Sequence, residues 1–161
     1  MDYFEDVVSE YLRADRSLFI NTQCCIQLNE GKNPDTSGPH WYCDAIAADF
    51  RAKQIYLCEI TFSDPPSPLL KRLSQWGDNW AGVRAALVRD SKLPEDWHVR
   101  PWIFAPAKLV HSVVAHVTKL TEGSLPVPKI TPLEFVVPWE YCSWNREGEK
   151  NKPDSIPESM R

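Results

Sequence analysis

Two acidic residues stand at the ends of two apolar segments within residues 41–61. Asp44 opens the first segment, Glu59 closes the second, and the polar run 51–54 separates them. If this run is a turn centred on Ala52, the two segments are paired strands and Asp44 lies across from Glu59 and Ile60. Opposed residues on paired strands have β-carbons ~5 Å apart. Two carboxylates at that distance repel each other unless a cation or a shared proton relieves them. The pair therefore predicts a site for Mg²⁺ or Mn²⁺.

Each of these acids also has a simpler interpretation. Asp44 can start a strand, accept backbone hydrogen bonds or pair with an arginine. Glu59 lies in the apolar sequence YLCEIT, where an unpaired buried carboxylate costs several kcal/mol, so it needs a partner, a proton or an ion. Asp49 is a competing acid, but its place beside the turn predicts exposure. His111 and His116 are five residues apart, which places them around a helix from each other and makes them flank residues rather than a metal pair.

Hydrophobic periodicity predicts the elements that position the acids. An apolar stripe at helical spacing predicts an amphipathic helix over residues 3–13. Apolar steps of three and four residues predict a helix from the proline-rich run at 64–68 to about residue 87, with a kink or break near Gly77-Asp78. A further helix is predicted over residues 107–120. Segments rich in β-branched and apolar residues predict strands at 18–28, 41–50, 55–62, 97–105 and 133–139.

The predicted order of elements is α-β-β-β-α-β-α-β, which describes an α/β fold with a single mixed sheet flanked by helices. Residues 1–144 are expected to form this one domain. Residues 145–161 are polar, charged and proline-bearing, so we expect a disordered or extended tail. Pro101 predicts an edge position or irregular pairing for its strand.

Composition narrows the class of protein. The chain has 161 residues, of which 43% are hydrophobic and 25% charged, as in ordinary globular domains. No apolar run approaches the ~20 residues that span a bilayer, and no signal peptide is visible, so we expect a cytoplasmic protein. The five cysteines form no C-x-x-C pair and are expected to be buried, reduced thiols rather than zinc ligands. A net charge of −4 means that a nucleic-acid partner would need a local basic patch.

This order of elements, with acids at these places, resembles the restriction-endonuclease-like superfamily, the PD-(D/E)xK nucleases. The core of that family is a helix, a three-strand meander, a helix and a further strand. The resemblance covers roughly residues 3–140, as an ordering of elements rather than as extended identity. It implies a Mg²⁺-dependent hydrolase of phosphodiester bonds in DNA or RNA, with nucleic acid as the partner. Many such nucleases act as dimers, so the resemblance also allows a homodimer.

The resemblance carries over to individual residues. Asp44 takes the place of the strand-two aspartate, preceded by Cys43 where the family pattern has proline. Glu59 takes the place of the strand-three acid. Two residues later, where the family has lysine, this chain has Thr61. A neutral hydroxyl cannot supply the positive charge of lysine, so Thr61 is the main departure from the family pattern.

The resemblance also implies the remaining site residues. Some family members supply the lysine from the following helix, which makes Lys71 the candidate substitute. An acid on the first helix completes the metal ligands, and both Glu5 and Glu10 border the apolar stripe there. The backbone carbonyl of Ile60 is a further ligand that the resemblance implies.

Three functions remain open from the sequence. The first is an active nuclease, favoured by the two retained acids. The second is a catalytically inactive relative that binds nucleic acid or a protein partner, favoured by the lost lysine. Basic side chains for that role are dispersed over Arg72, Arg84, Arg89 and Lys92. The third is a protein-interaction subunit without a nucleic-acid role.

Overall fold

The first helix packs one apolar stripe against the sheet. In a computed structural model that describes residues 3–29, 38–141 and 155–161, helix α1 spans Tyr3–Arg13. Acidic residues occupy its first turn, where the helix dipole favours negative charge. Val8, Tyr11 and Leu12 form its buried face. The predicted first helix is therefore confirmed.

Five strands form one mixed sheet in the order β1-β2-β3-β4-β5. Their bounds are β1 Leu18–Gln27, β2 His40–Asp49, β3 Gln54–Ile60, β4 His98–Ala105 and β5 Lys129–Pro132. The first three strands pair antiparallel, as expected for a meander. Strand β4 pairs parallel with β3, and β5 pairs parallel with β4. The α/β class with one mixed sheet flanked by helices is confirmed.

The helix predicted between the third and fourth strands is two helices. Helix α2 spans Ser67–Asp78 and helix α3 spans Trp80–Ser91. The chain leaves the helical conformation at Asn79, whose backbone φ is −124°. The Asn79 side chain donates a hydrogen bond to the carbonyl of Gln75 at 2.9 Å, which satisfies one of the last carbonyls of α2. The observed order is therefore α-β-β-β-α-α-β-α-β, with α4 at Ala107–Thr121.

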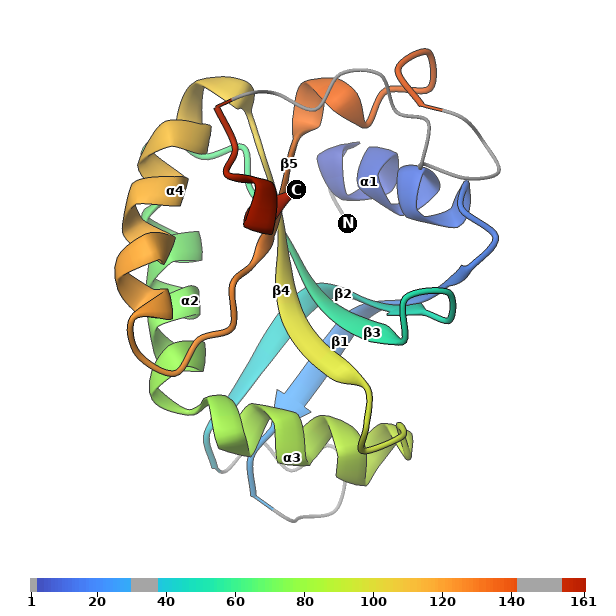
Figure 1. Cartoon of the computed structure of the whole chain (residues 1–161), viewed down its shortest axis with the longest axis vertical. Helices are drawn as coiled ribbons and strands as arrows, with labels where there is room; N and C mark the ends of the chain where they lie inside the picture. The colour runs from blue at the N-terminus through green and yellow to red at the C-terminus, as the bar shows by residue number, and fades with distance from the viewer. Residues whose placement is uncertain (1–2, 30–37, 142–154) are drawn as a thin grey trace.

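The sheet separates two hydrophobic cores. On one face, α1 and the 3₁₀ helix η1 (Leu133–Phe135) pack against the sheet. On the other face, residues of α2, α3 and α4 form the larger core. Figure 1 shows α2 and α4 side by side across the sheet from α1, with α3 crossing near the far end of β1. No helix among the described residues is long and apolar enough to cross a bilayer.

Two expectations about the second half of the chain need correction. The last strand is residues 129–132, and the segment predicted as a strand from Leu133 instead begins with η1. Strand β4 is internal rather than an edge. Its pairing with β5 begins only at Trp102, so Pro101 has a ladder partner on the β3 side alone, and a missing N–H is tolerated.

The predicted disordered tail is wrong for its last residues. Residues 145–154 lie outside the described part of the chain. Residues 155–161 are described, and they end in the 3₁₀ helix η2, Glu158–Met160. Ile156 and Met160 are buried in the core beneath α2 and α4. Two apolar side chains at this spacing bury enough surface to dock a segment that is polar on average.

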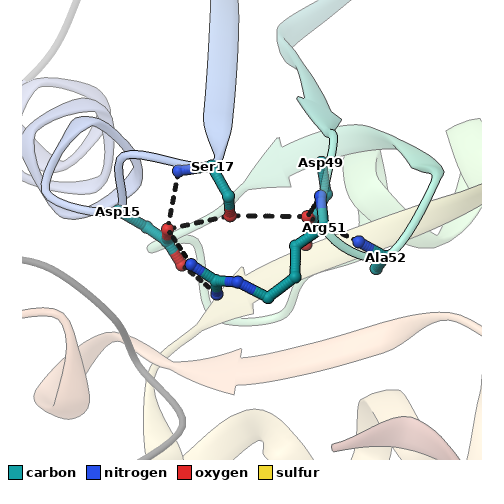
Figure 2. A network of polar contacts seen from close by, with 5 residues as sticks. All are labelled: Asp15, Ser17, Asp49, Arg51 and Ala52. Atoms are coloured by element: carbon teal, nitrogen blue, oxygen red, sulfur yellow. Dashed lines mark hydrogen bonds and ion pairs between the residues drawn. The ribbon is translucent and has the colours of Figure 1, made fainter.

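A polar network fixes the turn between β2 and β3 (Figure 2). One carboxylate oxygen of Asp49 accepts the backbone N–H groups of Arg51 and Ala52, at 2.9 and 3.0 Å. Ser17 donates its hydroxyl toward this oxygen and toward Asp15, which joins the turn to the start of β1. Asp49, the competing acid in the sequence, is therefore half-buried in a turn-forming role, at the far end of β2 from Asp44.

Candidate functional site

The two predicted acids, Asp44 and Glu59, lie on the neighbouring strands β2 and β3. The ladder between these strands runs from Asp49 opposite Gln54 to Ala45 opposite Cys58. One further step in the same register places Asp44 beside Glu59. The carboxylate of Asp44 accepts the backbone N–H of Ile60, with 2.6 Å between oxygen and nitrogen. The sequence register is therefore confirmed.

The β1–β2 ladder is interrupted beside Asp44. Thr22 pairs with Ala45 and Cys24 with Cys43, but no ladder pair joins the residues between them in the described strands. Gln23, which stands across from Asp44, has a left-handed φ of 54°. The buried faces also exchange here, because Ala45 belongs to the α1 core and Cys43 to the α2–α4 core. This bend points the Asp44 carboxylate at the end of β3.

Glu59 is almost fully buried, with 2% of its surface exposed. Its Oε2 accepts a hydrogen bond from Nη1 of Arg72 at 2.6 Å, and the two side chains form an ion pair. Its Oε1 is buried and has no hydrogen-bond partner among the described residues. Burial and the nearby charge of Asp44 raise the pKa of Glu59 to about 8, while Arg72 opposes that rise. The site thus holds one carboxyl group whose charged form is strongly disfavoured.

Arg72 comes from the buried stripe of α2. It lies three residues after Leu69 and four before Trp76, and both of these side chains are buried against the sheet. This spacing places its guanidinium on the sheet side of the helix, beside Glu59. Burial acts against the charge of Arg72, but Glu59 and Asp44 outweigh it and raise the pKa of the guanidinium. An arginine therefore supplies positive charge to the acid pair.

Arg72 is the basic residue that lies beside the acid pair. The sequence predicts Arg72 among dispersed basic residues and predicts Lys71 as the substitute for the lysine that the resemblance implies. Lys71 is exposed and lies on the solvent side of α2. The helical period distinguishes the two residues, because Arg72 is three residues after Leu69 and four before Trp76, whereas Lys71 is at neither spacing from these buried residues.

Thr61 has ordinary backbone and side-chain roles. Its N–H donates to the carbonyl of Phe104 at 2.9 Å, which continues the β3–β4 pairing past Ile60. Its hydroxyl accepts the N–H of Ser63 at 3.3 Å in the turn that leaves the sheet. Ile60 itself donates its N–H to Asp44, as described above. These bonds fix the direction in which the chain leaves β3.

The two helix acids differ in their surroundings. Glu10 is paired with Arg13 at 2.8 Å, and its side chain is 69% exposed. Glu5 is half-buried in the first turn of α1, next to Phe4, which stacks on Phe62 just beyond β3. No three His, Cys, Asp or Glu side chains within 3–29, 38–141 and 155–161 lie close enough together to hold a metal ion. Neither helix acid therefore forms a three-ligand group with Asp44 and Glu59.

Other candidate residues lie away from the acid pair. His111 is exposed and His116 half-buried on α4, as flank residues. Of the cysteines, Cys43 and Cys58 are buried as expected, but Cys24 and Cys25 are only partly buried. Cys142 lies outside the described residues.

Comparisons with protein-family models, with curated proteins and with solved structures found no match for this chain. Functional inference therefore starts from the geometry of Asp44, Glu59 and Arg72.

Proposed function

We propose that this chain is a metal-dependent phosphodiester hydrolase of the restriction-endonuclease-like type, acting on DNA or RNA. The observation that carries the proposal is the position of Asp44, on β2, beside the end of β3, where it accepts the N–H of Ile60 and lies next to the buried Glu59. The order of the first three strands and the parallel β4 agrees with the core that the sequence resemblance implies.

The donor set fits a magnesium ion that keeps most of its water. Mg²⁺ sites in nucleases commonly use one or two carboxylates, with water and substrate phosphate in the other positions. Glu59 offers a buried Oε1 that lacks a hydrogen-bond partner, and Asp44 is its charged neighbour. Of the two helix acids predicted as a third ligand, Glu5 is half-buried and Glu10 is exposed, so Glu5 is the better candidate. A bound Mg²⁺ polarises a phosphodiester oxygen and lowers the pKa of an attacking water.

Arg72 takes the part that the motif lysine has in the family. Its guanidinium is charged at any physiological pH and is already held beside Glu59 at 2.6 Å. Positive charge at this point offsets the charge of a phosphate and of a developing oxyanion. Arg72 rather than Lys71 thus supplies the positive charge of the site, and Thr61 has a backbone-positioning role.

The first experiment is a calorimetric titration of Mg²⁺ and Mn²⁺ into the wild type and a double variant, Asp44→Asn with Glu59→Gln. We expect binding to the wild type and none to the double variant. Binding at pH 7 also releases protons, because a cation lowers the raised pKa of Glu59. The control is Glu10→Gln, which changes an exposed acid and keeps wild-type binding. A wild type that binds no metal at millimolar concentration contradicts the proposal.

The second experiment tests which basic side chain, Arg72 or Lys71, supplies positive charge to the site. Cleavage of plasmid and single-stranded nucleic acid is measured for Arg72→Ala and for its neighbour Lys71→Ala. We expect Arg72→Ala to lose about a hundredfold or more in rate, the usual effect of removing one charge-stabilising donor. Lys71→Ala keeps nearly full activity, because this side chain is exposed. Loss of activity in Lys71→Ala alone contradicts the role given to Arg72.

A second function, a nuclease-fold domain that binds without cleaving, is favoured by one specific observation. The Arg72 guanidinium already neutralises the acid pair from within the chain, as a purely structural ion pair does. Under this alternative, metal binding and cleavage are both absent in the wild type. Binding to nucleic acid then weakens steeply with salt, whereas salt-insensitive binding indicates a protein partner.

A further inference from the structure

Two cysteines stand directly opposite each other on β1 and β2. Cys24 pairs with Cys43 in the antiparallel ladder. Opposed residues in such ladders have α-carbons about 4.5–5.5 Å apart. Disulfides join α-carbons about 4.4–6.8 Å apart. The strand pairing alone therefore brings the two backbones within the range that a disulfide requires.

The two thiols also share one face of the sheet. Cys43 is buried in the core on the α2–α4 side, and Cys24 packs against the same core. The Cys24 thiol donates to the carbonyl of Asn21 at 3.4 Å, and the Cys43 thiol donates to the carbonyl of Ala45 at 3.6 Å. The neighbouring Cys43 side chain lowers the pKa of Cys24. The two side chains therefore lie on neighbouring strands and on one face of the sheet.

Cys24 is the thiol that solvent and small molecules reach. It is partly exposed and lines a cavity of about 350 Å³ between β1 and α3. Leu87 and Asp90 of α3 form the other wall of this cavity. Cys43 is 1% exposed, so a reagent reaches it only through Cys24. Because Cys24 is accessible and Cys43 lies opposite it in the ladder, Cys24 is the attacking thiol and Cys43 is the resolving thiol.

We propose that Cys24 and Cys43 form a redox-reactive dithiol, which a hydroperoxide converts into a cross-strand disulfide. The Cys24 thiolate attacks the distal oxygen of the hydroperoxide, so that an S–O bond forms and the O–O bond breaks. The alcohol or water that leaves takes up the thiol proton, and Cys24 becomes a sulfenic acid. The Cys43 sulfur then attacks the Cys24 sulfur, an S–S bond forms, and the hydroxyl leaves as water with the Cys43 proton. Two electrons pass from the thiols to the hydroperoxide.

This inference goes beyond the proposed function and does not depend on it. The neighbouring cysteines on these strands have no thiol opposite them in the ladder. Cys25 pairs with Tyr42, and Cys58 pairs with Ala45. Cys25 lines the same cavity as Cys24 and has similar exposure. It is therefore the matched control, with equal access but no thiol opposite it in the ladder.

The test treats the full-length protein with hydrogen peroxide and measures the intact mass and the cross-linked peptides. We expect the wild type to lose the mass of two hydrogen atoms and to give one cross-linked peptide, joining Cys24 to Cys43. Cys25→Ser gives the same product. Cys43→Ala stops at a Cys24 sulfenic acid, which a dimedone adduct identifies. Cys24→Ser shows neither product.

Other results overturn the proposal. A cross-link from Cys24 to Cys25 or to Cys142 contradicts the assigned partner. Loss of two hydrogen atoms in Cys43→Ala contradicts it as well. If a cysteine variant does not fold, peptide mapping of the oxidised wild type still decides the question, because it requires no substitution. A wild type that stays fully reduced, or that gains only oxygen atoms, refutes disulfide formation.

Discussion

At the scale of single residues, Glu59 carries the largest unfavourable electrostatic interaction of the site. It is 2% exposed and stands beside Asp44, and one of its carboxylate oxygens has no hydrogen-bond partner among the described residues. Arg72 relieves part of this cost through the ion pair at 2.6 Å. Removing one partner of a buried pair is strongly destabilising, because it leaves the other charge uncompensated.

The raised pKa of Glu59 makes stability depend on pH. The folded-state pKa is about 8 against an ordinary value of 4.5, so the folded protein binds this proton more tightly than the unfolded chain. The contribution to stability is complete below pH 4.5 and is lost as pH rises to about 8. Relative to Glu59→Gln, the wild type loses at most about 5 kcal/mol over this range, since one pKa unit is about 1.4 kcal/mol.

Urea unfolding of both proteins at pH 5 and pH 8 measures this effect. The difference between the two free energies of unfolding should change in favour of Glu59→Gln at pH 8. Glu10→Gln is the control, because Glu10 is exposed, and it should follow the wild type. Parallel pH profiles for the wild type and Glu59→Gln would show that Glu59 is charged in the folded state at an ordinary pKa.

The sequence predicted the acid pair but did not predict that Arg72 pairs with Glu59. Asp44 and Glu59 followed from strand alternation and the short turn, which are local properties. Arg72 required the packing side of α2, and the family pattern directed attention to Lys71 instead. The orphaned Oε1 of Glu59 could not be predicted at all, because it depends on how β3, β2 and α2 pack together.

At the scale of elements, the β2–β3 turn is fixed by the network of Figure 2. Asp15 is 5% exposed and accepts the backbone N–H and the hydroxyl of Ser17, each at 2.9 Å. Arg51 reaches the same carboxylate at 3.4 Å from the turn. The end of α1, the start of β1 and the turn are therefore joined through one buried acid, which helps to hold the register on which Asp44 depends.

Asp15→Ala should destabilise the protein by about 1–3 kcal/mol, because the partly buried donors of Ser17 lose their acceptor. Arg51→Ala should cost under about 1 kcal/mol, since this side chain is 43% exposed and its contacts are long. Chemical denaturation of the two variants measures both values. Equal losses of unfolding free energy would indicate that the Arg51–Asp15 ion pair, rather than the Ser17 hydrogen bonds, fixes the β2–β3 turn.

Element boundaries followed closely from periodicity in the first half of the chain and less closely in the second. The helix and meander over residues 3–60 match the predicted ranges to within two residues at their observed ends. The predicted kink or break near Gly77-Asp78 is confirmed, because α2 ends at Asp78 and α3 begins at Trp80. The replacement of a strand by η1 depends on tertiary packing. A run such as LEFVVPW reads as a strand locally, but β5 has already used the sheet edge at residues 129–132.

At the scale of the whole molecule, the segment at residues 155–161 completes the core on the α2–α4 side. Ile156 is 1% exposed and Met160 4% exposed, and the Arg100 guanidinium donates to the carbonyl of Ser159 at 3.0 Å. A segment that composition marks as a polar tail is thus part of the packed domain.

Ile156→Ala should lower the free energy of unfolding by about 2–4 kcal/mol, as for other large-to-small changes in a core. Val127→Ala is the control, because Val127 is 37% exposed, and it should cost under about 1 kcal/mol. Thermal and urea unfolding measure both. A loss for Ile156→Ala no greater than for Val127→Ala would mean that residues 155–161 add nothing to the core.

The hydrogen bond from the Ile60 amide to Asp44 gives the site its own spectroscopic reporter. This amide donates to a carboxylate at 2.6 Å, at the point where the β2–β3 ladder has ended. Its nuclear magnetic resonance frequency therefore depends directly on the charge of Asp44. A proton, a cation or a phosphate that changes this charge shifts the Ile60 amide signal. Binding at the acid pair can therefore be followed without a dye, a substrate or a catalytic assay.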